Sequence, residues 1–359
     1  MLKEVFLMKI FGNELENKTV EALESCLSKV PFLKIGDIVR EPSKEEAKPD
    51  LLVKIDLPDG EKYLVVEIKG NGQPRIAREA VNQLLRYRDL LPDAYGVFVA
   101  PYISPKSAEI CTREEMGYLD LAGNCRLCFG KVYIEQEGKP NVFAKKRDLR
   151  SLYSPKAERI LRVLLNNSKR KWKTKELADE AQVSLGQVSN VKKLLMDREW
   201  AKTEKSGFLL SEPEQLLKEW AENYSFRRNR VIDYYSLKSV VEVEADIAKL
   251  CNRKGLLYAF TGFSGAARLA PTVRYQRVFA YVEETEEDIS SLLDLKRVSS
   301  GANVSLLFPY DVGVFYGRRE LEGTQIASPI QIYLDVFGFR GRGEEAAGAL
   351  LKQVILTQW

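Results

Sequence analysis

The chain has 359 residues, of which 55 are basic and 51 acidic, and it contains no histidine. This length predicts two or three domains, and the net charge of +4 is too small to indicate nucleic-acid binding without a local basic cluster. The lack of histidine excludes Ser-His-Asp and Cys-His catalysis, and the lack of a run of about 18 apolar residues predicts no membrane span.

The N-terminal segment begins Met1-Leu2-Lys3-Glu4 and has no cleavable apolar core, so we expect no secretory signal. Residues 16–30 predict a helix with one apolar face. Residues 32–39 then lead through the charged loop 40–48 to two strand-like segments, 51–57 and 63–69, rich in Val, Ile, Leu and Tyr. The residues Pro58-Asp59-Gly60-Glu61 between these strands are typical of a turn.

The pairing of these two strands would place three charged side chains together. If Leu57 pairs with Lys62 across a four-residue loop, Asp50 lies opposite Lys69. Glu67 and Lys69 share a face because strand side chains alternate, and Asp50 joins that face diagonal to Glu67. Cross-strand neighbours lie roughly 5–8 Å apart, so the two carboxylates could hold one Mg²⁺ or Mn²⁺ ion. A one-residue slip would move Asp50 to the wrong face.

This arrangement favours phosphodiester chemistry. A cation there could bind a scissile phosphate and activate water, and Lys69 could stabilise the negative charge that develops on the phosphate. The following helix carries Gln83 and Tyr87 at positions i and i+4, on one face. The glycine-rich loop 70–74 could approach a phosphate closely or could simply connect strand and helix.

Three motifs resemble the PD-(D/E)XK nuclease superfamily: Pro49-Asp50, Glu67-Ile68-Lys69 and Gln83-Leu84-Leu85-Arg86-Tyr87. The Gln-x-x-x-Tyr element resembles the RecB-like branch. The resemblance implies a restriction-endonuclease-like αβ sandwich over residues 1–150, with Asp50 and Glu67 as metal ligands. It implies a catalytic set of Asp50, Glu67, Lys69, Gln83 and Tyr87. The upstream histidine of many RecB-like enzymes is missing, and Glu21 or Glu24 could stand in for it.

The rest of this region carries weaker signals. Residues 95–100 predict a following parallel strand, and Asp120 and Asn124 either lie near the cleft or form a turn. Cys125 and Cys128 have no second pair and no histidine to complete a zinc site, and we interpret them as core packing on a strand, with thiols on opposite faces. The five scattered cysteines predict a reducing, cytoplasmic location. The basic segment 145–150 would close the domain.

Residues 151–211 carry a second pattern. Helices are predicted over 155–166, from 173 with Thr174 as N-cap, and over 187–198, followed by a hairpin over 200–210 with Ser206-Gly207 at its tip. This order resembles a winged helix-turn-helix, which places its last helix in the major groove of double-stranded DNA or serves protein contacts instead. The basic cluster favours DNA. The candidate DNA-contacting residues are Lys169, Arg170, Lys171 and Lys173 for phosphates and Gln187, Asn190, Lys192 and Lys193 on the last helix.

Residues 212–359 predict a C-terminal α/β domain with strands at 256–260, 278–282 and 304–308. Gly262-Phe263-Ser264 resembles an interrupted nucleotidyltransferase Gly-Ser, but no Asp-x-Asp follows it, and the acidic run 283–287 completes no catalytic set. We therefore expect this domain to contact a partner or a second copy of the chain.

The whole chain resembles AbiEi-type antitoxins, the DNA-binding regulators of bacterial type IV toxin–antitoxin and phage-abortive systems. The segments behind this resemblance are the loop 72–74, residues 120–124, the winged helix, and residues 262–271, 328–335 and 341–343. It implies double-stranded DNA and a nucleotidyltransferase-type toxin as partners, and a homodimer is a further expectation. Two hypotheses remain: a metal-dependent nuclease acting in defence, and an antitoxin regulator whose nuclease fold only binds DNA or a partner.

Overall fold

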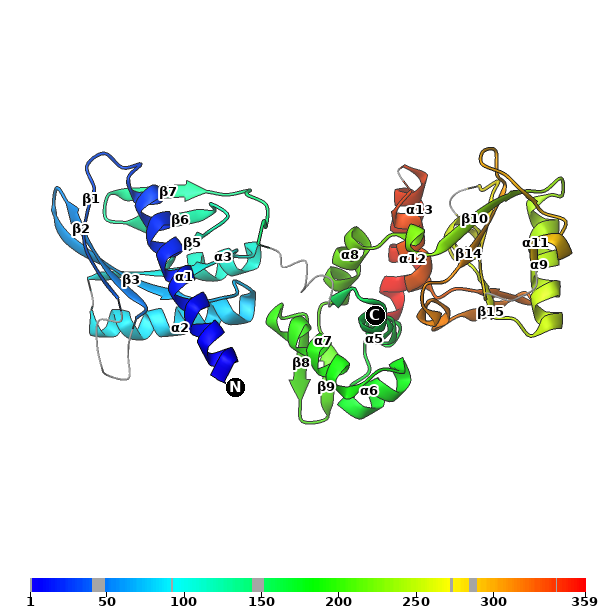
Figure 1. Ribbon diagram of the computed structural model, residues 1–359, viewed down its shortest axis with the longest axis horizontal. Coiled ribbons are helices and arrows are strands. Elements are labelled where there is room, and N and C mark those ends of the chain that lie inside the picture. The colour runs from blue at the N-terminus through cyan, green and yellow to red at the C-terminus, as the bar shows by residue number, and fades with distance from the viewer. Residues whose placement is uncertain are drawn as a thin grey trace. The chain divides into compact units, whose positions relative to one another are not determined.

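The structure is a computed structural model that describes residues 2–40, 49–91, 93–143, 152–271, 274–283, 289–339 and 341–359, with the side chains of residues 2–13 excepted. Residues 41–48 of the predicted charged loop 40–48, the basic segment 145–150 and residues 284–287 of the predicted acidic run 283–287 lie outside the described residues. The chain divides into two compact units: Met1–Lys146 with Asp197–Glu199, and Arg147–Met196 with Trp200–Trp359 (Figure 1).

The first unit is a seven-stranded sheet with helices on both faces. The strands lie in chain order, antiparallel at both sides of the sheet and parallel through its centre, where β4 pairs with β3 as predicted. The elements are α1 (Leu2–Leu27), β1 (Lys34–Arg40), β2 (Leu51–Leu57), β3 (Gly60–Ile68), α2 (Pro74–Leu90), β4 (Ala94–Ala100), α3 (Pro105–Arg113), β5 (Gly117–Asp120), β6 (Cys125–Phe129) and β7 (Val132–Gln136).

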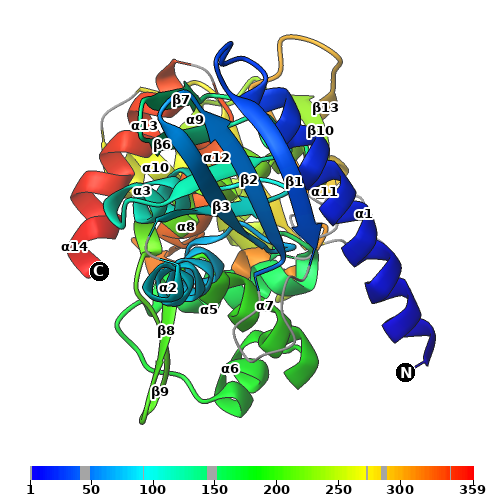
Figure 2. The same cartoon turned by 90° about the vertical axis from the view of Figure 1, so that its left-hand side faces the viewer.

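Two hydrophobic cores lie on the two faces of this sheet. Leu23 and Leu27 of α1 pack into the first core with alternating residues of β2, β3 and β4, and Figure 2 shows α1 running obliquely past β1 and β2. Leu84 of α2 and Ile110 of α3 belong to the second core, with Val65 and Phe98 from the other face of the sheet. The αβ sandwich therefore follows from strands that bury side chains on both faces.

The β2–β3 hairpin is tighter than predicted. Leu57 pairs with Gly60 instead of Lys62, so the two-residue loop Pro58-Asp59 replaces the expected four-residue loop. Gly60 has a φ of +132°, a conformation that L side chains rarely adopt, which permits this tight turn. The register prediction was wrong by two residues, and because the side-chain period is two, the faces are unchanged.

The second unit begins with a module of three helices and a hairpin, in the predicted order. Its elements are α5 (Pro155–Asn166), α6 (Thr174–Ala181), α7 (Leu185–Asp197), β8 (Ala201–Glu204) and β9 (Gly207–Leu210). Trp172 adds a bridge to the hairpin, since its N–H donates to the Phe208 carbonyl at 2.7 Å and its carbonyl accepts from the Phe208 N–H at 2.9 Å. The N-cap of α6 is Lys173, one residue before the predicted Thr174.

The remainder of the second unit is a mixed seven-stranded sheet in the order β13-β10-β14-β12-β11-β16-β15, with helices on both faces. The predicted strands near 258, 278 and 304 are β11, β12 and β14. The elements are α8 (Pro213–Asn223), η1 (Phe226–Arg228), β10 (Arg230–Tyr235), α9 (Val240–Lys254), β11 (Tyr258–Phe260), α10 (Gly262–Leu269), β12 (Val278–Val282), α11 (Ile289–Leu292), β13 (Lys296–Arg297), β14 (Val304–Phe308), η2 (Val312–Phe315), β15 (Arg319–Leu321), β16 (Thr324–Ile326), α12 (Pro329–Phe337), α13 (Arg342–Leu350), η3 (Leu351–Ile355) and α14 (Leu356–Gln358).

One hydrophobic core joins the two parts of the second unit. Leu161 and Leu164 of α5 belong to the same cluster of buried side chains as Trp220 of α8 and Ile330 of α12. The regions on either side of residue 211 therefore share a core, while the assignment of three functional domains, 1–150, 151–211 and 212–359, stays a prediction. The α/β multidomain fold class is confirmed. None of the described helices is long and apolar enough to cross a membrane.

Candidate functional site

Asp50, Glu67 and Lys69 meet at one end of β2 and β3. The Lys69 Nζ lies 2.5 Å from the buried Glu67 Oε1, and the Ile68 N–H donates to Asp50 Oδ2 at 2.6 Å. The Asp50 N–H extends the β2–β3 ladder by donating to the Val66 carbonyl at 3.1 Å. With Leu51 opposite Val66, Asp50 comes level with Glu67 and not with Lys69 as expected. The tighter register thus brings the two acids directly across from each other.

The two carboxylates of this cluster lie close enough to affect each other's ionisation and that of Tyr87. The pKa of Glu67 is raised, chiefly by burial; the ion pair with Lys69 opposes this rise and the nearby Asp50 carboxylate adds to it. Burial and the charges of Glu67 and Asp50 raise the pKa of Tyr87 to about 12. Tyr87 therefore belongs to the same electrostatic environment as the two acids.

Two buried oxygen atoms, one of this cluster and one of α2, have open hydrogen-bonding capacity. Glu67 Oε2 and Gln83 Oε1 are buried and accept no hydrogen bond of normal geometry from any described residue, although the Tyr87 hydroxyl is near enough to lower the Glu67 pKa. A buried oxygen without a donor is costly, and oxygen is the ligand that Mg²⁺ prefers. The Asp50–Glu67 pair therefore fits a divalent cation. Within the described ranges no group of three His, Cys, Asp or Glu side chains could hold a metal, so further ligands would be backbone, water or substrate oxygens.

Helix α2 positions Gln83 and Tyr87. Its apolar face, which includes Ala77, Ala80 and Leu84, packs on the sheet, so Tyr87 is buried and Gln83 is half-buried on the flank of that face.

The close packing of two backbone segments explains the glycine in the loop before α2. A Cβ added at Gly72 would lie 2.1 Å from the Tyr102 carbonyl oxygen, so this glycine allows two backbone segments to approach.

Asp120 and Asn124 form a turn. Asp120 is buried, and its carboxylate accepts hydrogen bonds from the Asn124 N–H at 2.8 Å, the Asn124 Nδ2 at 2.9 Å and the Ile103 N–H at 3.2 Å. These bonds use both carboxylate oxygens inside the first unit. Of the two interpretations left open for these residues, the structure supports the turn.

The predicted phosphate-contacting cations lie directly before α6. Lys169, Arg170, Lys171 and Lys173 are all exposed. The Arg170 guanidinium covers the Trp172 ring at 3.8 Å, and Lys171 pairs with Glu204 of β8 at 2.7 Å. Lys202 also pairs with Glu204, at 3.3 Å, which places a further cation of the hairpin beside this cluster. Sequence reasoning missed Lys202, although its place in a predicted hairpin was a usable signal.

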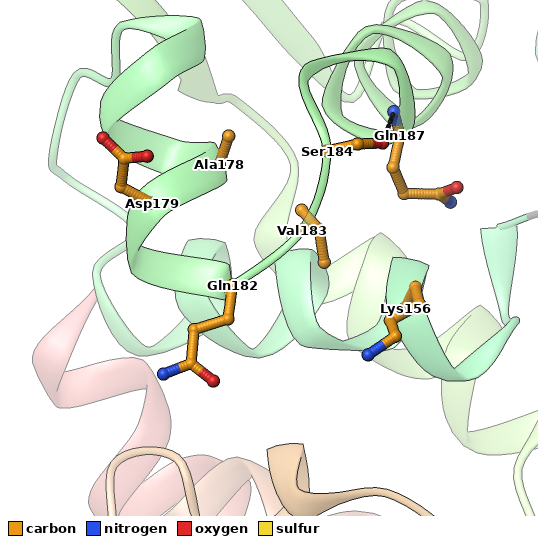
Figure 3. A pocket seen from close by; sticks show the side chains of 7 residues that line it. All are labelled: Lys156, Ala178, Asp179, Gln182, Val183, Ser184 and Gln187. Carbon is orange, nitrogen blue, oxygen red and sulfur yellow. Dashed lines mark hydrogen bonds between the residues drawn. The ribbon is translucent and has the colours of Figure 1, made fainter.

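The predicted residues of α7 fall into two groups. Asn190 and Lys193 are exposed, whereas Lys192 is half-buried, with its ammonium 5.5 Å from the centre of the Phe208 ring, so part of its role is packing. Gln187 lines a shallow depression of about 620 Å³ with Lys156 of α5 (Figure 3). The other lining residues are Ala178, Asp179, Gln182, Val183 and Ser184. Sequence reasoning did not identify Lys156, because only folding brings the start of α5 to α7.

The interrupted Gly-Ser segment of the C-terminal region is buried. Thr261 Oγ1 donates to Asp335 at 2.5 Å, and Ser264 Oγ accepts a hydrogen bond from the Phe279 N–H at 3.1 Å. Both side chains are fully buried. These hydroxyls support the packing of α10 on the sheet.

Comparisons with solved structures give three partial likenesses. A structure described as an EndoMS–dsDNA2 complex is 18% identical over 26% of this chain and 42% of that chain, with a TM-score of 0.20. A repair endonuclease from Pyrococcus abyssi is 20% identical over 28% and 45% of the two chains, with a TM-score of 0.21. SfsA of Pyrococcus furiosus in complex with Ca²⁺ is 19% identical over 35% and 64%, with a TM-score of 0.20. This chain thus spans less than two thirds of each.

No curated protein matches the chain. A family model does match part of it, over residues 209–356, and that family is described as "Transcriptional regulator, AbiEi antitoxin, Type IV TA system". The matched segment begins near the end of β9 and covers nearly all of the mixed sheet and its helices. The resemblance to AbiEi-type antitoxin regulators is therefore confirmed for residues 209–356.

Proposed function

We propose that this chain is a DNA-binding transcriptional regulator of the AbiEi antitoxin type. The observation that carries the proposal is the family match over residues 209–356, preceded in the same compact unit by a three-helix and hairpin module with exposed cations. In this function α7 enters the major groove of duplex DNA, and the matched region binds a nucleotidyltransferase-type toxin. The site of action is the cytoplasm.

The module offers two kinds of DNA contact. Lys169 and Lys173 are exposed beside the start of α6, where they can reach phosphates and release counterions. Asn190 and Lys193 are exposed on α7 and can reach base edges. Lys171 is paired with Glu204, so its phosphate contact would compete with that ion pair.

Fluorescence anisotropy of labelled duplex DNA with the full chain at several salt concentrations tests this function. We expect affinity to fall steeply with salt, and Lys169→Ala or Lys173→Ala to reduce the slope of log K against log salt by about 1 each. The matched control is Lys218→Ala, an exposed lysine of α8 that pairs with Glu214 and should leave the slope unchanged. Absent binding, binding that is indifferent to salt, or an equal effect of Lys218→Ala would contradict the proposal.

A second function is supported by the cluster at the end of β2 and β3, namely metal-dependent hydrolysis of DNA phosphodiester bonds. The observation that favours it is the buried, unsatisfied Glu67 Oε2 beside Asp50 and Lys69. Asp50 and Glu67 would hold Mg²⁺ or Mn²⁺, which when bound supplies Lewis-acid activation of water and phosphate.

The chain's own residues have separable tasks in this second function. Glu67 holds Lys69 through its Oε1, which positions the ammonium at the rim of the site. Lys69 is half-buried and can stabilise negative charge that develops on a phosphate oxygen. Tyr87 lies near the acids and Gln83 lies one turn before it on α2, and in this function the amide and hydroxyl orient a nucleotide.

Thermal unfolding with and without Mn²⁺, paired with a cleavage time course on plasmid DNA, tests the site. Mn²⁺ should raise the Tm of the wild type, and Asp50→Asn or Glu67→Gln should remove that rise. Lys69→Ala should keep the rise but lower cleavage by about 10²–10³-fold. Lys62→Ala, which changes a half-buried lysine of β3, is the matched control and should cleave normally.

The two functions separate in this experiment. Stabilisation by Mn²⁺ without cleavage would mean that the chain is a regulator whose nuclease-like fold binds a metal but does not cleave DNA. Equal cleavage by wild type and Lys69→Ala would place any activity elsewhere, and no response to Mn²⁺ would reject the metal site.

A further inference from the structure

Cys26 and Cys125 hold their thiols close together in the core of the first unit. The two Sγ atoms lie 3.4 Å apart, with the Cys26 thiol donating to Cys125. Cys26 is in the last turn of α1 and Cys125 is the first residue of β6, and their side chains are 4% and 3% exposed. Cys128, three residues further along β6, is exposed on the opposite face.

We propose that Cys26 and Cys125 form a redox-active dithiol, which a hydroperoxide converts reversibly into a disulfide bond between α1 and β6. The pair differs from ordinary core cysteines because each sulfur is the other's polar neighbour. Cys111 and Cys251 are also buried, but within the described part of the chain neither has a hydrogen bond to a second thiol such as the one that joins Cys26 and Cys125. Proximity is the main requirement that two thiols must meet before oxidation can join them.

The surroundings distinguish the two sulfurs chemically. The hydrogen bond between them lowers the pKa of Cys125, the acceptor, and raises the pKa of Cys26, the donor, while burial raises and the Lys29 ammonium lowers the pKa of both thiols. The Lys29 ammonium also donates to Gln136 Oε1 of β7 at 3.2 Å, in an exposed hydrogen bond. Cys125 is therefore the attacking thiolate and Cys26 the resolving thiol.

The proposed reaction balances in two steps. The Cys125 thiolate attacks one oxygen of hydrogen peroxide; the O–O bond breaks, a sulfenic acid forms, and the departing hydroxide takes up the proton released on ionisation, giving water. Cys26 then gives up its proton and attacks the sulfenic sulfur, the S–S bond forms, and the second oxygen leaves as water. Two thiols are oxidised by two electrons and one peroxide is reduced. Dithiothreitol reverses the change by thiol–disulfide exchange.

The bond would join residues 99 positions apart. It would fasten the end of α1 to the face of the sheet on which Leu23 and Leu27 pack. A cross-link over so long a loop restricts the unfolded chain, so the oxidised first unit should unfold at a higher temperature than the reduced one.

The test treats the full chain with hydrogen peroxide, alkylates the remaining thiols, digests the protein and maps disulfides by mass spectrometry. We expect a peptide pair linked through Cys26 and Cys125, an intact mass lower by two hydrogens, full reversal by dithiothreitol, and a higher Tm for the oxidised form. Cys128→Ser should retain all four results, because this thiol faces the other way.

Cys26→Ser and Cys125→Ser should each lose the link and the Tm difference. If a variant fails to fold, the peptide map of the wild type decides alone. Over-oxidation of Cys125 without a link, linkage only through Cys128, or thiols that stay fully alkylatable after peroxide would overturn the proposal.

Discussion

Asp335 shows most clearly how a single residue is controlled by its surroundings. It is fully buried on α12, and its carboxylate accepts hydrogen bonds from Thr261 Oγ1 at 2.5 Å, from the Tyr224 and Tyr281 hydroxyls at 2.9 Å each, and from Gln331 Nε2 at 3.0 Å. Burial raises the pKa of Asp335 to about 6, and these four donors only partly oppose that rise.

We predict that Asp335 lowers the free energy of unfolding as the pH rises. The folded state keeps the Asp335 proton up to about pH 6, whereas the unfolded carboxyl loses it near its ordinary pKa of 3.8, so the folded state binds more protons in between. The free energy of unfolding should therefore fall between about pH 4 and 7, by up to about 3 kcal/mol.

The Asp335→Asn variant has no titratable group at this position. Its free energy of unfolding, measured with urea, should therefore not fall over this pH range. The difference between variant and wild type should grow through pH 6. Asp246→Asn is the control, since this acid is on the surface in an ion pair with Lys238. Parallel pH profiles for Asp335→Asn and the wild type would show that the buried acid does not titrate in this range.

Helix α5 is the element that ties the helix–hairpin module to the AbiEi-matched region. Arg162 is fully buried, and its Nε and Nη2 donate to Gln331 Oε1 of α12 at 2.9 and 2.8 Å. One turn earlier, Glu158 is also fully buried; it pairs with Arg228 at 2.5 Å and accepts hydrogen bonds from Trp220 and Tyr310. A helix with this buried polar side is held by specific partners as well as by apolar packing.

Glu158→Leu should destabilise the second unit by about 3–5 kcal/mol, because it leaves the buried Arg162 guanidinium without the carboxylate that lies 3.8 Å from its Nη1. Urea unfolding followed by tryptophan fluorescence is a direct measure, since all four tryptophans, Trp172, Trp200, Trp220 and Trp359, lie in the second unit. The matched control is Glu214→Ala, which removes an exposed ion pair with Lys218 and should cost less than about 1 kcal/mol. Similar losses in both variants would mean that the buried pair is not a special contributor.

The compact units of the molecule do not coincide with the segments to which we assign functions. Residues 152–211 carry the candidate DNA-contacting side chains, but their helix α5 is buried in a core shared with α8 and α12. The segment 152–211 should therefore be poorly folded when isolated, whereas 152–359 should unfold cooperatively, because isolation exposes Leu161 and Leu164 to water. Circular dichroism melts of both segments measure this, and a sharp melt of the short one would contradict it.

The partner prediction also belongs to the whole molecule. The AbiEi-matched region should carry the contacts to a toxin or to a second copy of the chain. Light scattering of the full chain and of the segment 152–359, which keeps the shared core intact, should show the same association state, alone or with a nucleotidyltransferase-type toxin. A segment 152–359 that stays monomeric and unbound where the full chain associates would assign these contacts to another surface.

The sequence by itself determined the elements and the composition of the candidate site. Alternating apolar residues specify β2 and β3, because strand periodicity is a local property, and the same alternation puts Glu67 and Lys69 on one face. The helix–hairpin module was likewise predictable from local patterns, as was the separation of Cys125 and Cys128 onto opposite faces.

Only the tertiary structure decided what depends on distant packing. Residues 58–61 are compatible with loops of two or four residues, and the pairing across β2 and β3 selected the shorter, which set Asp50 opposite Glu67. The Cys26–Cys125 contact and the Arg162–Gln331 hydrogen bonds join residues that lie far apart in the chain, and no local pattern predicts them. The burial that leaves Glu67 Oε2 without a hydrogen-bond donor likewise follows only from packing. Burial and partner choice are collective properties of the folded chain, which is why no window of sequence contains them.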